Sequence, residues 1–213
     1  MINQEKLPCK EFKIKENGKE FGDLEAISIV TDPAIEMSFQ LFEKANINHF
    51  ASAPMSSDKQ RITGPVMVPY KKILRQDENK EYYMGWFSEQ TIIDCAQNYL
   101  RKGRNRSGNL EHLEEYTKDF YVFESWIVED PTNDKCNALG FKDIPKGTWF
   151  VTYQVTNKDK WNEIKNGSYT GFSVEIDAAL FSSSITEDDI KAIVFNSEMT
   201  DEAKEIKLRE LLK

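Results

Sequence analysis

The chain contains, at residues 167–175, the run Gly167-Ser168-Tyr169-Thr170-Gly171-Phe172-Ser173-Val174-Glu175, which is typical of a β-strand that follows a turn. Side chains of a strand alternate between its two faces, so Phe172 and Val174 share one face. Gly171 and Ser173 share the other. The first face is bulky and favours burial in a core, while the second presents a hydroxyl beside a glycine and leaves room for the backbone of a substrate. The run therefore predicts half-buried sheet with Ser173 on its open side.

Similar patterns on both sides of this run predict a mixture of strands and helices, the α+β class. One helix is predicted from a Ser88 cap to about Lys102, with Ile92, Ile93, Ala96, Tyr99 and Leu100 on its apolar face. A shorter helix is predicted over residues 158–166. Strands are predicted over residues 24–30, 62–69, 81–87, 121–128, 148–155 and 169–176, and a short apolar run occupies residues 39–42.

The same patterns divide the chain into four parts. Residues 1–42 form an N-terminal strand segment, and residues 43–60 are rich in Asn, Ser and Pro and form a linker or loop. Residues 61–181 hold most of the strand patterns and form the main domain. Residues 182–213 form a helical C-terminal tail, with helix starts near Thr186 and Thr200.

Composition excludes several classes of protein. The chain has 213 residues, a formal net charge of −8, two histidines and three cysteines without CxxC spacing. No run is long and apolar enough to span a bilayer, and the opening residues do not resemble a signal peptide. We therefore expect reduced thiols, a cytosolic location, and neither a membrane nor nucleic acid as partner. The basic run 101–106 is interpreted as a solvated loop.

Neither a cofactor nor a metal is expected. The chain lacks the GxGxxG, GxxxxGK[ST], HExxH and GxSxG motifs, and two histidines are too few for a multi-histidine metal centre. A serine nucleophile needs a base, and histidine is the natural one. His49 falls in the linker, which leaves His112 by elimination. From the residues alone, both Ser173 and His112 retain a purely structural interpretation.

The run from Ile62 to Glu175 resembles the XkdF-like serine proteases of tailed phages, which are related to the prohead (capsid maturation) proteases and share a fold with the herpesvirus assemblin. The opening Glu25 to Glu36 is also similar to the start of such phage proteins. No single matching motif is specific for this family, but the order of the motifs along the chain is. The matching pieces are residues 62–69, Asn109-Leu110-Glu111-His112, Glu124 to Asp130, Pro145 to Trp149, Trp161 to Gly167, and Gly171-Phe172-Ser173-Val174-Glu175.

The resemblance implies a small, mostly antiparallel β-barrel flanked by helices, with a histidine on one strand as general base and a serine on a later strand as nucleophile. These are His112 and Ser173. Assemblins use a second histidine, and none follows Ser173 here. A carboxylate is then the expected third member. Glu124, in the strand after His112, is the first choice; Glu175, on the same face as Ser173, and Glu111 remain open, as does a dyad.

The resemblance also implies a head-maturation serine endopeptidase that cleaves scaffold and capsid protein segments, and itself, inside the assembling prohead in the host cytoplasm. Residues 43–60 and the Ser182–Ser184 junction are candidate self-cleavage sites. The C-terminal helices are candidates for self-association. The alternative is a catalytically inactive capsid or scaffold component with the same fold. A nucleic-acid-binding module that uses residues 101–106 is disfavoured by the charge of −8.

Overall fold

The computed structural model describes residues 7–16, 18–20, 22–35, 37, 40–42, 59–113, 116–182, 193–194, 199–200, 202–204 and 206–207. The strands are β1 (Cys9–Lys13), β2 (Lys15–Glu16), β3 (Lys19–Glu20), β4 (Asp23–Val30), β5 (Gln40–Phe42), β6 (Arg61–Met67), β7 (Ile73–Gln76), β8 (Tyr82–Trp86), β9 (Gly108–Leu110), β10 (Phe120–Ile127), β11 (Trp149–Val155), β12 (Gly171–Asp177) and β13 (Ala179–Ser182). The helices are α1 (Glu89–Arg101), the 3-10 helix η2 (Arg104–Arg106), α2 (Lys135–Ala138) and α3 (Lys158–Lys165).

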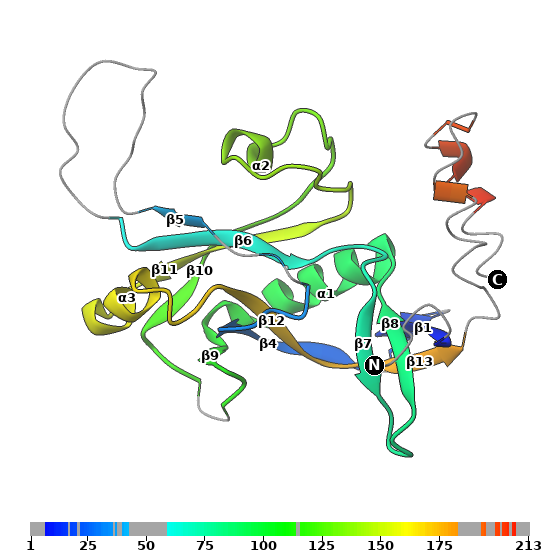
Figure 1. Cartoon of the computed structure of the whole chain (residues 1–213), viewed down its shortest axis with the longest axis horizontal. Coiled ribbons are helices and arrows are strands. Elements are labelled where there is room, and N and C mark those ends of the chain that lie inside the picture. The colour runs from blue at the N-terminus through cyan, green and yellow to red at the C-terminus, as the bar shows by residue number, and fades with distance from the viewer. Residues whose placement is uncertain are drawn as a thin grey trace.

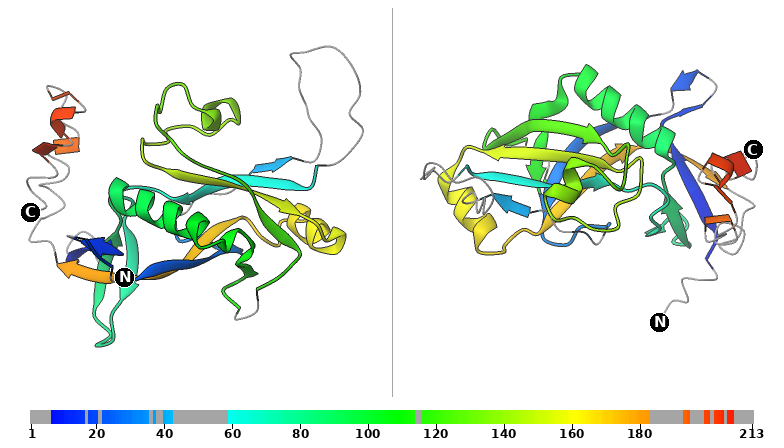
Figure 2. Two further views of the ribbon diagram at one scale, coloured as in Figure 1. Left: turned by 180° about the vertical axis from the view of Figure 1, so that it is seen from behind. Right: turned by 90° about the horizontal axis from the view of Figure 1, so that it is seen from above.

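Three larger sheets and the β2–β3 hairpin organise these elements. The sheets have the strand orders β10-β11-β6-β5, β12-β4-β9 and β13-β1-β8-β7. The first lies over the second, α1 runs along one side of both, and the third stands at one end (Figures 1 and 2). The α+β class is confirmed. Within the described residues these sheets remain separate and do not close into a barrel, so the expected barrel is not confirmed.

The main core lies between the two stacked sheets. Phe172 of β12 is 1% exposed, and its ring packs edge-on against Tyr153 of β11 with 5.4 Å between ring centroids. The Tyr153 hydroxyl donates a hydrogen bond of 2.9 Å to the carbonyl of Ile27 in β4. A buried hydroxyl without such an acceptor would destabilise the fold, so this bond helps to fix the two sheets against each other. The apolar face predicted for residues 172 and 174 is the face that packs on this core.

Helix α1 follows its predicted pattern closely. Ser88 is the N-cap, and its side chain accepts a hydrogen bond from the Thr91 amide. Ile92, Cys95, Ala96 and Tyr99 are buried. Leu100, predicted on the same face, is 48% exposed, so that detail is wrong. It lies in the last turn, where the helix leaves the sheet.

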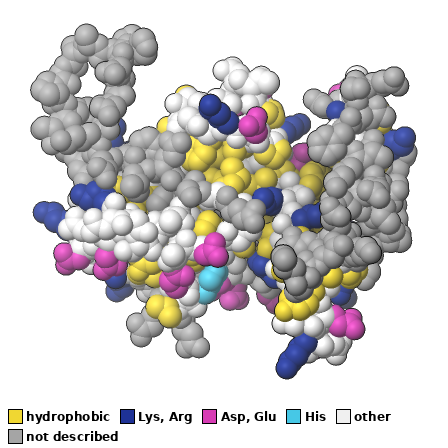
Figure 3. All heavy atoms as spheres, viewed as in Figure 1, with side chains coloured by type: hydrophobic (Ala, Val, Ile, Leu, Met, Phe, Trp, Pro, Cys, Tyr) yellow, Lys and Arg dark blue, Asp and Glu magenta, His cyan; other side chains and the backbone are white. Residues whose placement is uncertain are grey.

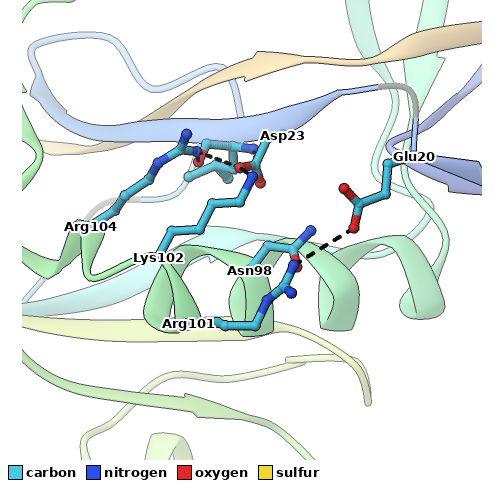
Figure 4. A network of polar contacts seen from close by, with 7 residues as sticks. Glu20, Asp23, Asn98, Arg101, Lys102 and Arg104 are labelled. Atoms are coloured by element: carbon cyan, nitrogen blue, oxygen red, sulfur yellow. Dashed lines mark hydrogen bonds and ion pairs between the residues drawn. The ribbon is translucent and has the colours of Figure 1, made fainter.

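The basic run after α1 is tied to β4 by ion pairs, as Figure 4 shows. Lys102 Nζ pairs with the Asp23 carboxylate, and Arg104 NH1 lies 2.8 Å from the same Oδ2 atom. The Asp23 side chain is only 12% exposed, so these pairs are partly shielded from water. The run is therefore less solvated than its composition predicted, because two of its cations anchor the end of α1 to the start of β4.

Several predictions fall on residues that the structure does not describe. The linker interpretation of 43–60, including His49, lies outside the described residues except at its last two positions. In the predicted tail, residues 193–194, 202–204 and 206–207 are helical, and most of the remainder is undescribed. No helix in the described part of the chain combines the length and apolarity needed to cross a membrane. The elements that were not predicted are strands β1, β2, β3, β7, β9 and β13, the 3-10 helix η2 and helix α2.

Candidate active site

The sheet β12-β4-β9 brings three polar residues into one row. Ser173 of β12 is the antiparallel partner of Ser28 in β4, and Ser28 is the parallel partner of Asn109 in β9. Directly paired residues of neighbouring strands project on the same face of a sheet. Ile27 and Ile29 pack in the core, so the row projects on the opposite face.

A strained turn places His112 above this row. Strand β9 ends at Leu110, and Glu111 and His112 follow with φ angles of +51° and +57°. Two consecutive residues other than glycine in this left-handed region carry a conformational cost, of order 1–3 kcal/mol each, that other contacts must offset. His112 is thus in a turn directly after a strand. The expectation of a histidine on a strand is wrong, because the positive φ angles end the extended conformation.

Contacts of Glu111 offset this cost. Its Oε1 atom accepts hydrogen bonds of 2.6 Å from both the amide and the hydroxyl of Thr31, which follows β4. Its backbone amide donates to the carbonyl of Ile29 at 3.1 Å, and the amide of Leu113 closes the turn on Leu110 at 3.0 Å. Glu111 therefore positions the turn and does not contact the imidazole in this structure.

The His112 ring is bonded through Nδ1. This atom lies 3.1 Å from Ser28 Oγ and 3.2 Å from Glu175 Oε1. Glu175 Oε1 also accepts hydrogen bonds from Asn109 Nδ2 at 2.5 Å and from Ser28 Oγ at 3.1 Å. An ionised carboxylate can only accept, so the network assigns the proton of a neutral His112 to Nδ1. The lone pair then resides on Nε2, as a general base requires.

The site has a buried floor and an open top. Ser28 and Asn109 are 0% exposed, whereas the His112 side chain is 41% exposed and that of Glu175 29% exposed. Figure 3 shows the histidine ring at the surface with acidic side chains beside it. Ser28 is therefore suited to hold the imidazole and the carboxylate, and it is closed to a bulky substrate. Sequence reasoning missed both floor residues, although Ser28 is a polar residue between two buried isoleucines.

Ser173 lies beside this network but is not bonded to it. Its side chain is half-buried and forms no hydrogen bond with any residue in the described ranges, His112 included. Because it is paired with Ser28 and is two residues from Glu175 on the same strand, it shares their face of the sheet. Ser173 is therefore the partly exposed serine of the row, next to Ser28, which is bonded to the imidazole.

The Glu124 side chain lies elsewhere. It pairs with Lys135 of α2 and accepts a hydrogen bond of 3.4 Å from Thr152, in the sheet that contains β10 and β11. Glu175 was one of the two alternative third members, with Glu111, and it is the carboxylate that the structure brings to His112. Glu124 was the first choice from the sequence because its strand, β10, follows His112. In the structure, however, β10 pairs with β11 and not with β9.

A cavity of about 550 Å³ opens beside Ser173. It runs along β12 from Phe172 to Asp177, and β6, β7 and β8 form the facing wall. Its volume is in the range of small-ligand pockets.

Comparison with known proteins gives a match to a protein family. Residues 49–181 match the family model described as "Putative phage serine protease XkdF". No curated protein and no solved structure matches. The matched range is more than half of the chain and includes His112, Ser173 and Glu175, while β4 and Ser28 precede it. The chain therefore belongs to the XkdF family of phage serine proteases.

Proposed function

We propose that this protein is a serine endopeptidase of phage head maturation, with Ser173 as nucleophile, His112 as general base and Glu175 as the carboxylate that orients the base. One observation carries the proposal: His112 Nδ1 lies 3.2 Å from Glu175 Oε1 on the face of the sheet that also holds Ser173. The arrangement frees Nε2 for proton transfer and gives the imidazolium a nearby negative charge.

The reaction follows from these roles. Ser173 Oγ attacks the carbonyl carbon of the scissile bond while His112 Nε2 takes the hydroxyl proton, and the imidazolium then gives this proton to the leaving amine. Water hydrolyses the resulting acyl-enzyme with the same base. Since Ser173 is not bonded to the ring in this structure, the two groups approach each other when substrate binds, as catalytic hydrogen bonds often do.

The resemblance to prohead proteases supports the biological setting of the proposal. The substrates are scaffold and capsid protein segments, and cleavage takes place inside the assembling prohead in the host cytoplasm. The chain also cleaves itself, within residues 43–60 or near Ser182, and its C-terminal helices associate with one another or with these partners. A barrel of the prohead-protease type also belongs to this proposal.

A fluorophosphonate probe tests the chemistry without knowledge of the substrate. Wild-type protein should be labelled, and mass spectrometry should find the adduct on Ser173. Ser173→Ala and His112→Ala should abolish labelling, whereas Ser168→Ala, a change of an exposed serine before β12, should not. An adduct on Ser28 would transfer the nucleophile to the floor of the site. Persistent absence of labelling, also in assembled particles, favours the inactive structural protein.

Processing of the natural partners tests the biological role. The protein is co-expressed with the capsid and scaffold proteins of its phage, and the products are followed on gels. Shortened partners are expected with wild type and with Ser168→Ala, and full-length partners with Ser173→Ala and His112→Ala. Normal processing by both inactive variants would refute the assignment of the protease to this chain.

A further inference from the structure

The outer edge of β12 runs along the cavity and pairs with no strand of the described residues. In the sheet order β12-β4-β9, β12 is a terminal strand, and no strand in the described ranges pairs with its outer side. Backbone N–H and C=O groups of such an edge are a template for another extended chain. At the start of β12, the Pro33 ring and the Met37 carbonyl occupy the space that a Cβ atom on Gly171 would need.

The wall that faces this edge is largely apolar. The apolar residues that line the cavity come from several elements: Ile35, Val66 of β6, Val68 after β6, Ile73 of β7 and Phe87 after β8. With a volume of about 550 Å³, the space accepts a large apolar side chain. A strand edge beside an apolar pocket supplies both parts of peptide recognition by strand addition, in which backbone bonds give affinity and the pocket gives specificity.

A cation lies on this wall. Arg75 of β7 lines the cavity, and its NH1 donates a hydrogen bond of 3.0 Å to the neighbouring Leu74 carbonyl. No carboxylate of the described ranges lies within ion-pair distance of its guanidinium. Loss of hydration at the cavity lowers the pKa of Arg75 from its ordinary value. A ligand carboxylate there would replace the lost water, since Arg favours carboxylate partners. Glu25 and Asp177 make the opposite wall unfavourable to acidic groups.

We propose that the free edge of β12 and the adjoining cavity bind an extended peptide segment that carries a large apolar side chain and an acidic residue, the apolar group entering the cavity and the carboxylate pairing with Arg75. The segment adds to the sheet as a strand beside β12. That this segment is the protease substrate rests on the proposed function, because Ser173 lines the same cavity. Binding itself does not require cleavage.

The test uses the full chain with Ser173→Ala, so that bound peptide is not hydrolysed. A phage-displayed library of random heptapeptides, the length of β12, is selected on this protein. We expect enrichment of peptides with one large apolar residue and one Asp or Glu. The affinity of a selected, fluorescein-labelled peptide is then measured by anisotropy against further variants in the same background.

Four variants distinguish the cavity from the rest of the surface. Ala34→Phe fills the cavity from its half-buried rim, and Arg75→Ala removes the cation; each should weaken binding about tenfold or more. The matched controls Ala138→Phe and Arg106→Ala, at exposed positions remote from the cavity, should change the affinity less than about twofold. Circular dichroism and urea unfolding verify that each variant folds. Arg75→Glu should bind better when the acidic residue of the peptide is replaced by Lys.

Strand addition has its own readout. Alternate residues of an added strand direct their N–H groups to the sheet, so N-methylation of one alternate set should abolish binding and methylation of the other set should not. Equal effects of both sets would overturn strand addition. Affinity unchanged by Ala34→Phe and Arg75→Ala, or no enrichment at all, would overturn the cavity as the binding site. Binding that follows these expectations while Ser173 takes no fluorophosphonate would retain the cavity proposal and reject the catalytic one.

Discussion

Replacement of Glu175 by Gln removes one negative charge from the candidate triad and little else. Gln has nearly the same shape, and its amide oxygen can still accept from Asn109 Nδ2 and Ser28 Oγ, which lie 2.5 and 3.1 Å from Glu175 Oε1. The charge acts when His112 accepts the proton of Ser173, since the imidazolium then forms 3.2 Å from the carboxylate. The variant therefore tests the electrostatic role of Glu175 at nearly constant geometry.

The magnitude follows from this distance and from the exposure of the pair. Two unit charges 3.2 Å apart attract by about 1 kcal/mol in bulk water and about 5 kcal/mol at an effective dielectric constant of about 20. The side chains of His112 and Glu175 are 41% and 29% exposed, which favours a value between these limits. A loss of about 2–3 kcal/mol of transition-state stabilisation corresponds to a rate lower by about 10²-fold.

The assay is the second-order rate of fluorophosphonate labelling of Ser173, with folding checked by circular dichroism. Glu129→Gln, a neutralisation at an exposed position after β10, is the matched control and should label at the wild-type rate. Glu124→Gln should also label at nearly that rate, because Glu124 pairs with Lys135 in the other sheet. A normal rate for Glu175→Gln together with a slow rate for Glu124→Gln would refute the reasoning and assign the third role to Glu124.

Three further predictions concern the fold that carries the site. Asp23→Asn should lower the free energy of unfolding in urea by about 1–3 kcal/mol, because Lys102 and Arg104 lose their shared, mostly buried carboxylate. The control is Asp94→Asn, on the half-exposed side of α1. Equal effects of the two changes would contradict an anchoring role of Asp23. Gly108→Ala should destabilise by about 1–3 kcal/mol, because the new Cβ atom would lie 2.6 Å from a Phe120 ring carbon, and a gain in melting temperature would contradict this. Burial raises the pKa of the Cys136 thiol to about 11, so it should resist iodoacetamide at pH 8 in the folded protein and react on unfolding. Since unfolding returns this thiol to its ordinary pKa near 9, the free energy of unfolding should fall between about pH 9 and 11, and a rise there would contradict the assignment.

Local sequence patterns were sufficient to predict the strand and the helix that flank the site. The alternation of residues 171–175 predicted which face of β12 is buried, and Ser88 predicted the start of α1. Elimination between two histidines selected His112, which the structure places beside the Ser28–Ser173 row. For β12 and α1 the information lies within a few residues of sequence, because strand period and helix caps are local properties.

The composition of the site depended on long-range pairing that local patterns do not contain. Ser28 lies 84 residues before His112 and 147 residues before Glu175, and β4 joins them by pairing with β9 on one side and β12 on the other. The position of Glu124 in the strand after His112 favoured it as the third member, whereas the observed strand order favours Glu175. The short strand β9 gave no alternating pattern of its own, so the turn that carries His112 was not foreseen.

The central position of β4 makes the segment before the family match part of the site. Strands β9 and β12 each pair with β4 and not with one another, so a chain that began at residue 49 would lose the strand between His112 and Ser173. It would also lose Ser28 and Thr31. Without Thr31, the strained Glu111–His112 turn would lose the two hydrogen bonds that Thr31 donates to Glu111. Strand β12 would keep Ser173 and the turn after β9 would keep His112, but no partner strand would align the two residues. The matched region therefore contains the proposed catalytic side chains, while the strand that sets their geometry comes from outside it.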